Sequence, residues 1–363
     1  MKKILLALLI AAACVTCCAC SLFKPKTYTV ALITSAAGIT DRSAAQGAYR
    51  AISAYGDLNG VTYKEYVPAE DTSESVGKQV SDAVSHGASL LVFAGEKMLP
   101  FARDAAKEYP ETDILTVDFA LPSQTQHTRA ITFAVEQAAF LAGYAAMAEG
   151  FRSFGFIAGE RNDRSQTYFN GFVNGIEYYL AERPDVPPSI KCWYSGQTGA
   201  NDVLEDVATD WFNSGVQVIF VCGDGLYRSL NYAANVSKKQ LIGSGLDQAG
   251  FSERYITTAA SEYQLAVTDE LTGYFKNGGF PEGKAGKEER LGIATDMIGL
   301  PNGYGAYRFT KFSAESYEAF YAGLKYNTLG VTASADLPDE VQSSITFYND
   351  GISSPAPVET SQE

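Results

Sequence analysis

Short apolar runs alternate with segments of helical character along most of the chain after residue 27. The runs 28–34 (YTVALIT) and 90–94 (LLVFA) are typical of buried strands, and a helix is expected at 43–55. This alternation predicts βαβ units, that is, parallel sheets with helices on both faces. The other expected strands are 61–67, 113–117, 130–133, 154–158, 190–194, 216–222, 240–243, 256–260 and 291–299, and the other expected helices are 72–85, 97–108, 136–148, 166–181, 201–213, 225–236 and 262–276.

So many strands do not fit comfortably into one sheet, and two doubly wound lobes joined by a hinge are the economical α/β arrangement. We expect the first lobe to hold residues 28–133 and about 256–290. The second lobe is expected to hold residues 134–255 and about 291–350. The last segment, 351–363, is rich in Ser, Pro and Glu and is predicted to be a disordered tail.

The N-terminus has the pattern of a secretory signal peptide. A basic start (MKK) precedes the uninterrupted apolar run 4–13, which is too short for a stable membrane span. The following CCACS segment resembles a bacterial lipobox, and Cys20, preceded by Ala19, is the best candidate for lipidation. We therefore expect a signal peptide at 1–19, a lipidated linker at 20–27 and a lipid anchor at the membrane. Cys14 and Cys18 are alternative lipid sites, and cleavage without lipidation is the other interpretation.

Composition and charge narrow the class of protein. The 363 residues carry a formal net charge of −14, which argues against a nucleic-acid partner because phosphate binding needs a basic surface. The 22 Tyr and 20 Phe are far too many for a disordered chain. Cys192 and Cys222 each lie near the end of an apolar run, and we favour two buried thiols over a disulfide.

Sequence signals of catalysis are missing. The chain has no G-x-S-x-G elbow, no H-E-x-x-H, no Walker loop and no clustered C-x-x-C. Its two histidines, His86 and His127, have no nearby nucleophile in a triad-like order and leave little for a zinc site. We therefore expect no catalytic residue, no metal and no cofactor, and we predict that the protein is not an enzyme.

Carboxylates gather where the expected strands end. Asp41, Asp118, Asp224 and Asp247 all follow apolar runs, and ligands of open α/β sheets bind beyond the carboxyl ends of the strands. Ionised carboxylates only accept hydrogen bonds, so this set suits a hydroxyl-rich or amine-rich ligand, such as a sugar ring or a ribose diol, rather than a phosphate. A helix N-cap is an equally good interpretation of Asp41 and Asp224. The loop 161–164 either faces the same cleft or is a solvated turn.

Three short motifs occur along the chain in a characteristic order. They are D-x-S-x-x-Q (Asp41, Ser43 and Gln46), E-x-x-x-x-L-A-G beginning at Glu136, and the pair Asp247-Gln248. With this order and the lipoprotein-like start, the chain resembles the basic membrane protein (BMP) family over about residues 28–330. These are PnrA-like nucleoside-binding lipoproteins that feed ABC importers. The resemblance implies a type I periplasmic-binding fold that closes two lobes on a purine nucleoside, with an ABC permease and ATPase as partners.

The chain departs from the family pattern at the positions that bind the base. The family usually reads D-x-S-F-N-Q in its first loop, with the Phe stacking on the base, whereas this chain has Ala44 and Ala45 there. The loop 195–202 also lacks the aromatic residue of relatives. Base stacking contributes about 1–3 kcal/mol per base, so nucleoside binding is expected to be weakened or retargeted. Phe119 and Tyr168 are candidate replacements, although aromatic residues near strand ends are more often part of the core. A sugar binder and a ligand-sensing lipoprotein outside transport are the alternatives.

Overall fold

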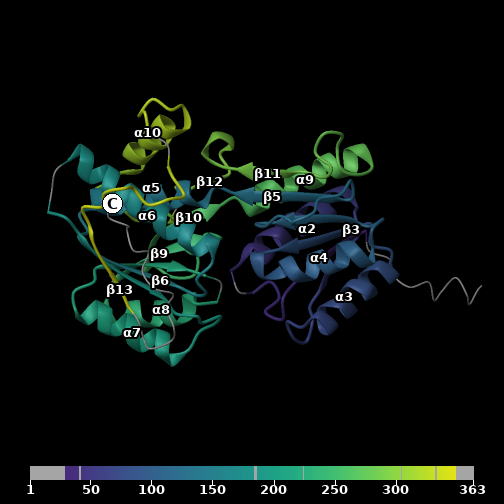
Figure 1. Ribbon diagram of the computed structural model, residues 1–363, viewed down its shortest axis with the longest axis horizontal. Coiled ribbons are helices and arrows are strands. Elements are labelled where there is room, and N and C mark those ends of the chain that lie inside the picture. Colours follow the sequence, from purple (N-terminus) through teal and green to yellow (C-terminus); the bar gives the residue numbers. More distant parts are fainter. Residues whose placement is uncertain are drawn as a thin grey trace, which may run out of the picture.

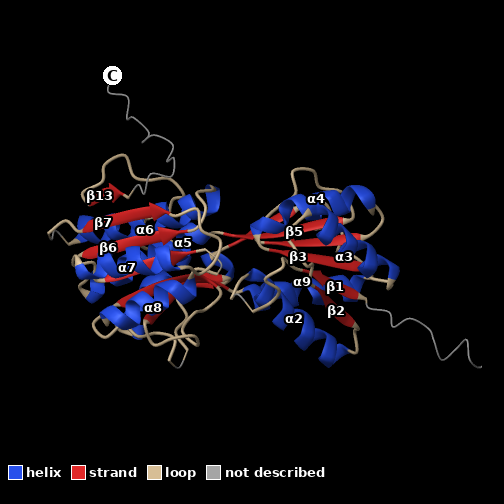
Figure 2. Cartoon of the chain, turned by 90° about the horizontal axis from the view of Figure 1, so that it is seen from below, coloured by secondary structure: helices blue, strands red, loops and turns tan. Residues whose placement is uncertain are grey.

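Two lobes make up the computed structural model, which describes residues 29–40, 42–183, 186–223, 225–303, 305–331 and 333–348. Each lobe is a sheet with helices on both faces, and narrow connections join the two (Figure 1 and Figure 2). The expected α/β architecture of two doubly wound lobes is confirmed. Within the described ranges, no helix combines the length and the apolar character needed to cross a bilayer.

The first lobe is built on a six-stranded parallel sheet. Its strands, in order across the sheet, are β11 (Glu288–Leu291), β5 (Thr128–Phe133), β4 (Asp113–Val117), β3 (Leu90–Ala94), β1 (Val30–Ile33) and β2 (Tyr63–Tyr66). Helices α2 (Ala44–Asn59) and α9 (Tyr263–Asn277) cover one face, and α3 (Ser73–Ser85) and α4 (Leu99–Glu108) cover the other. Side chains alternate along the strands, so Leu32 and Val92 pack toward α2 while Ile33 and Phe93 pack toward α3 and α4.

The second lobe is built on a seven-stranded sheet that is parallel except for β12. Its strands, in order, are β12 (Ile298–Gly299), β10 (Tyr255–Ser261), β9 (Gln240–Gly245), β8 (Val218–Cys222), β6 (Ser153–Ala158), β7 (Ser189–Tyr194) and β13 (Ser344–Phe347). Phe156 and Phe220 pack toward α6 on one face, and Ile157 and Ile219 pack toward α7 and α8 on the other. The helices of this lobe are α5 (Val135–Glu149), α6 (Asp163–Glu182), α7 (Asp202–Asn213), α8 (Tyr227–Ser237) and α10 (Ala314–Lys325).

The two predicted thiols lie inside the second lobe. Cys192 is on β7 and Cys222 ends β8, and both are buried thiols that form no disulfide. Strand β6 lies between β7 and β8, so the two cysteines are on strands that are not neighbours. The prediction of thiols rather than a disulfide is confirmed.

Within the described part of the chain, it passes between the lobes three times: after β5, after β10 and after β11. We call these three connections the hinge. They run side by side between the two bodies, where the ribbon is narrowest (Figure 2). Such a set of thin connections permits the lobes to open and close as nearly rigid bodies.

Two details of the expected organisation are wrong. The strand predicted at 291–299 is divided between the two sheets, because a 3₁₀ turn at Ile293–Thr295 and a left-handed Asp296 (φ 58°) interrupt the extended run. The strand expected at 256–260 in the first lobe is β10, which pairs with β9 and β12 of the second sheet. An apolar strand suits the interior of either sheet equally well, so its pattern does not decide the lobe.

Candidate functional site

The carboxyl ends of strands from both sheets face one another across a polar cleft. A cavity of about 290 Å³ lies at the ends of β4, β8 and β9, and a second of about 370 Å³ lies beside β1 and β3. The two cavities share Gly95, Lys97, Glu160 and Thr198 in their walls. Their size suits a small organic ligand, and their position is the one at which open α/β sheets bind ligands. We call both cavities together the cleft.

The local sequence explains how the loops reach the cleft. Gly95 takes φ 92° after β3, which turns the chain into a 3₁₀ segment carrying Glu96 and Lys97. On the opposite lobe, Asn162 caps α6: its side chain accepts a hydrogen bond from the Ser165 amide at 2.9 Å, and the Ser165 hydroxyl accepts one from the Asn162 amide at 3.0 Å. This reciprocal capping fixes the first turn of α6 and points Arg164 across the cleft.

Arg164 joins the two lobes through one hydrogen-bonded cluster. Its Nη1 donates to Asp118 Oδ1, and its Nη2 donates to the hydroxyls of Tyr263 at 3.0 Å and Tyr168 at 3.3 Å. The Tyr263 hydroxyl in turn donates to Asp118 Oδ2 at 2.9 Å. Asp118 and Tyr263 belong to the first lobe, and Arg164 and Tyr168 belong to the second. We call these four residues the Arg164 cluster.

Burial determines the electrostatics of this cluster. Burial raises the pKa of Asp118, while the positive charge of Arg164 and the Tyr263 hydroxyl act against that rise. Burial also raises the pKa of Tyr168. Although burial works in the other direction, the Asp118 charge holds the pKa of Arg164 well above its ordinary value. At neutral pH the cluster therefore contains a guanidinium cation and a phenol at Tyr168 that keeps its proton.

Glu96 is a carboxylate of the first cavity that lies outside this cluster. Its Oε2 is shut off from solvent and has no hydrogen-bond partner. Burial raises the pKa of Glu96, and the charge of Arg164 lowers it in part. A buried carboxylate oxygen with no partner is costly, so it is a natural acceptor for a ligand group.

Three of the residues predicted from the sequence reach the cleft. Asp118 and Tyr168 line the first cavity. Ser43 lines the second, and its side chain also caps α2 by accepting from the Ala45 amide at 3.2 Å. Ala45 lines the same cavity, and Ala44 is buried beside it in the core. The loop 161–164, whose orientation the sequence left open, contributes Asn162 and Arg164 to the cleft.

The other predicted residues are placed differently. Phe119 is buried in the core of the first lobe, among residues of α3 and α4, rather than in the cleft wall. The Asp247 carboxylate is bonded within its own lobe: Oδ1 accepts from the Ala249 amide at 3.0 Å and from the hydroxyl of Thr258 on β10 at 3.2 Å. Gln46 has a buried, unpartnered Oε1 but does not line the cleft. Asp41 and Asp224 lie outside the described residues, as does Cys20.

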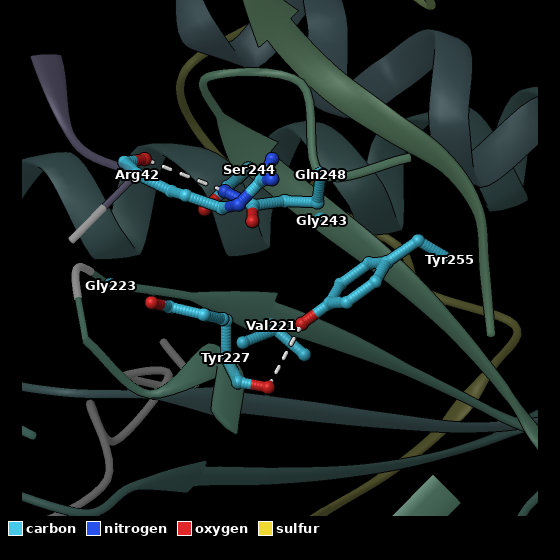
Figure 3. A pocket seen from close by; sticks show the side chains of 8 residues that line it. All are labelled: Arg42, Val221, Gly223, Tyr227, Gly243, Ser244, Gln248 and Tyr255. Atoms are coloured by element: carbon cyan, nitrogen blue, oxygen red, sulfur yellow. Dashed lines mark hydrogen bonds between the residues drawn. The ribbon is translucent and has the colours of Figure 1, made fainter. Parts of the chain in front are cut away.

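A third, very small cavity lies beside the cleft, where the first loop meets the second lobe (Figure 3). Its volume of about 10 Å³ is close to the minimum for one water molecule. Arg42 Nη1 donates to the Asp247 carbonyl at 3.2 Å, and Gln248 Nε2 donates to the Arg42 carbonyl at 3.5 Å. The Tyr227 hydroxyl donates to the Thr40 carbonyl at 3.4 Å. These contacts make the cavity part of the closed interface between the lobes, so we do not count it as a ligand site.

Several cleft residues are not among the sequence predictions. Glu96 and Lys97 follow β3, Gln197 and Thr198 follow β7, and Ser244 is near the end of β9. The rule that ligands bind at strand ends points to all these segments. The rule does not predict which side chain of each loop points into the cleft, because that depends on the geometry of the turn.

Comparison with known proteins supports one family. Residues 28–321 match the family described as "ABC transporter substrate-binding protein PnrA-like". The "ABC transporter nucleoside-binding protein BmpA" of Lactococcus lactis subsp. cremoris is 27% identical over 277 residues, which are 70% of this chain and 76% of that protein. The "CD4+ T-cell-stimulating antigen" of Listeria innocua serovar 6a is 25% identical over 298 residues, 76% of this chain and 80% of that protein.

Solved structures agree on the fold. A solute-binding protein of an ABC transporter system from Aeropyrum pernix K1 superposes with a TM-score of 0.65 at 18% identity, covering 86% of this chain and 82% of that one. This likeness confirms the expected periplasmic-binding fold. The family consists of substrate-binding proteins rather than enzymes, and they work outside the cytoplasm. With most of its length matched, this chain belongs to the PnrA-like family of ABC transporter substrate-binding proteins.

Proposed function

We propose that this substrate-binding protein captures a purine nucleoside between its lobes and presents it to an ABC permease and its ATPase. The observation that carries the proposal is the cleft itself, which lies at facing strand ends and is lined by polar groups from both lobes. Ser35 and Ser43 line it from the first lobe, and Gln197 and Ser244 line it from the second. Hydroxyl and amide groups of this kind suit a ribose and the polar edge of a base.

The aromatic side chains of the cleft bear on how a base would be held. The Tyr168 ring is only 1% exposed and is engaged with Arg164, so it offers little free face for stacking. Phe101 of α4 lines the second cavity, as does Ala45, and Phe101 is half-buried. We assign Phe101 the role of apolar contact for the ring, in the region where relatives carry their stacking Phe. The name of the Lactococcus relative, which is a nucleoside-binding protein, supports the ligand class.

A sugar without a base is the second candidate. The alanines at 44 and 45 favour it, because the family pattern has an aromatic face and an amide at these positions, which begin α2. A free pentose or hexose would use the same hydroxyl-lined walls and would not need a stacking partner. The two candidates differ in whether the second cavity, with Phe101, is filled.

Capture follows from a shift between open and closed lobes. A ligand that touches both lobes binds the closed form better than the open one, so it moves the hinge equilibrium toward closure. The closed surface is then what a permease recognises.

We further propose that Cys20 carries a lipid that tethers the protein to the outer face of the membrane. Mass spectrometry of the mature N-terminus would show diacylglyceryl on Cys20, and an unmodified N-terminus would refute the anchor.

Thermal unfolding against a ligand panel tests the function. We would use the chain without residues 1–19, with Cys20→Ser, after unfolding and refolding to remove any carried ligand. A ligand at 100 times its Kd adds about 2.7 kcal/mol to the free energy of unfolding, which is a clear rise in Tm. We expect the rise with inosine, guanosine or adenosine. A rise with ribose or a hexose alone would support the sugar candidate, and no rise with any of them would contradict both.

A variant that blocks the cleft tests whether the ligand binds there. Thr198 is exposed and lines both cavities, so Thr198→Trp should fill the cleft and abolish the ligand-induced rise in Tm. Thr272 is an exposed threonine on the outer surface of α9, and Thr272→Trp is the matched control. If both variants keep the full rise, the ligand binds elsewhere.

A further inference from the structure

In the Arg164 cluster, the cleft carboxylate Asp118 is hydrogen-bonded to other side chains of the protein, so its oxygens are not available to a ligand. The Asp118 side chain is 4% exposed, and each of its oxygens already accepts a hydrogen bond, one from Arg164 and one from Tyr263. Asp118 also adopts φ 77°, a left-handed conformation that aspartate tolerates better than most residues. The carboxylate is therefore held in place by two partners, one on each side of the hinge.

Glu96, in the same cavity, has a carboxylate oxygen without a hydrogen-bond partner, unlike Asp118. It lines the wall near Arg164, and its buried Oε2 has no hydrogen-bond partner. The charged residues of this cavity are Lys97, Arg164, Glu96, Asp118 and Glu160. Because Arg164 is paired with Asp118, Lys97 is left against the carboxylates of Glu96 and Glu160. With all three ionised, negative charge exceeds positive charge by one, which disfavours an anionic ligand.

We propose that Arg164 is a specificity-determining residue: its contact with Asp118 favours the closed arrangement of the lobes before a ligand binds, and it withdraws Asp118 from recognition. Glu96 is then the carboxylate that accepts the ligand's hydrogen-bond donors. The proposal rests on the proposed function and deepens it. The ligand class that follows is neutral and rich in donors, such as the ribose hydroxyls or the exocyclic amine of a nucleoside. Nucleotides and other anions are disfavoured.

The first test needs no ligand. Arg164→Met keeps the apolar stem and removes the guanidinium, so the ligand-free lobes should open and the radius of gyration from small-angle X-ray scattering should rise. Arg161→Met is the matched control, because Arg161 lies in the same loop and, among the described residues, its side chain bonds to Gln166 and lies over the ring of Tyr194, both in its own lobe. Should Arg164→Met fold poorly, Tyr263→Phe removes only the hydroxyl that bridges Asp118 and Arg164. An unchanged radius in both cluster variants would overturn the closing role.

The second test separates the two carboxylates. With inosine, adenosine and ribose as probes in calorimetric titrations, Glu96→Gln should lose affinity at least tenfold while the ligand-free radius stays that of the wild type. Asp118→Asn should behave like Arg164→Met, with an enlarged radius and a smaller loss of affinity. The reverse result, with binding lost in Asp118→Asn and kept in Glu96→Gln, would overturn the assignment. Tight binding of a nucleoside monophosphate would overturn the ligand class.

The two proposals fail in distinguishable ways. If no probe binds the wild-type protein, the proposed function fails, yet the scattering comparison of Arg164→Met with Arg161→Met still decides whether the cluster closes the lobes. If the probes bind and the scattering does not change, the nucleoside function stands and the role of Arg164 is refuted.

Discussion

Single residues decide how closely helices α5 and α6 approach. A Cβ at Gly175 would lie 2.0 Å from the Phe140 carbonyl oxygen, and a Cβ at Gly143 would lie 2.1 Å from the Phe172 carbonyl oxygen. Both distances are far below a van der Waals contact, so the two backbones touch where the glycines are. The aromatic side chains around them, including Phe140 and Phe172, are buried in the large core that continues into the hinge.

Replacing one of these glycines should therefore be destabilising. Gly175→Ala would force the helices apart and lower the free energy of unfolding by about 1–3 kcal/mol, the usual cost of overpacking. Gly77→Ala on α3 is the control, because nothing lies within 4 Å of its Cβ position and alanine favours the helix by up to about 1 kcal/mol. Chemical denaturation measures both. A Gly175→Ala protein as stable as the wild type would contradict the close packing.

At the same scale, the sequence could place some site residues and not others. Asp118 and Tyr168 reach the cleft because both lie at the carboxyl edge of a sheet, one after β4 and one in the first turns of α6. Phe119 follows Asp118 directly, and its side chain enters the core instead. The left-handed conformation of Asp118 directs the side chains of Asp118 and Phe119 to different places. The sequence pattern does not predict this conformation at an aspartate.

Side chains of α6 hold the backbone of the C-terminal segment that leads into β13. Asn174 Nδ2 donates to the Asp336 carbonyl at 2.7 Å, and the Glu177 carboxylate accepts from the Gln342 and Ser343 amides at 2.9 and 3.0 Å. These α6 side chains align the segment that becomes β13 against β7. Neither α10 nor β13 is predicted from the sequence, because their positions depend on partners more than 100 residues earlier in the chain.

The Glu149 carboxylate binds a loop backbone in a similar way, and this predicts that the stability of the protein depends on pH. Both oxygens of Glu149, at the end of α5, accept from the backbone amides of residues 310–312 and from the Thr310 hydroxyl. Burial acts in the other direction, but these hydrogen bonds hold the pKa of Glu149 below its ordinary value of 4.5. A depressed pKa in the folded state stabilises the protein above pH 4.5, and that contribution is lost as the pH falls through the folded pKa.

Glu149→Gln should accordingly lower the free energy of unfolding at pH 7 by about 1–2 kcal/mol, the value of hydrogen bonds to a charged group that is partly exposed. The difference from wild type should shrink as the pH falls below 4.5. Urea unfolding at several pH values measures this, with the exposed Glu282→Gln as the control. A difference that is the same at pH 7 and in acid would exclude the charge as the cause.

At the scale of the whole molecule, function depends on two bodies joined by a hinge and closed by contacts between them. The two lobes and their parallel sheets could be predicted because each βαβ unit has its own local pattern. The assignment of segments to the lobes around the hinge could not, since β10 is a buried strand that suits either sheet and the charged strand β11 carries no pattern that indicates its lobe. One set of closing contacts combines Asp118 and Tyr263 with Arg164 from the other lobe, residues brought together only by the fold.

The most direct test of capture between the lobes is hydrogen–deuterium exchange of the refolded protein with and without a saturating nucleoside. We expect slower exchange in cleft segments of both lobes, namely 95–98, 160–166, 197–198 and 244–246, with little change on the outer helices. Protection confined to one lobe, protection away from these segments, or no protection with any nucleoside would contradict the claim that the cleft closes on this ligand.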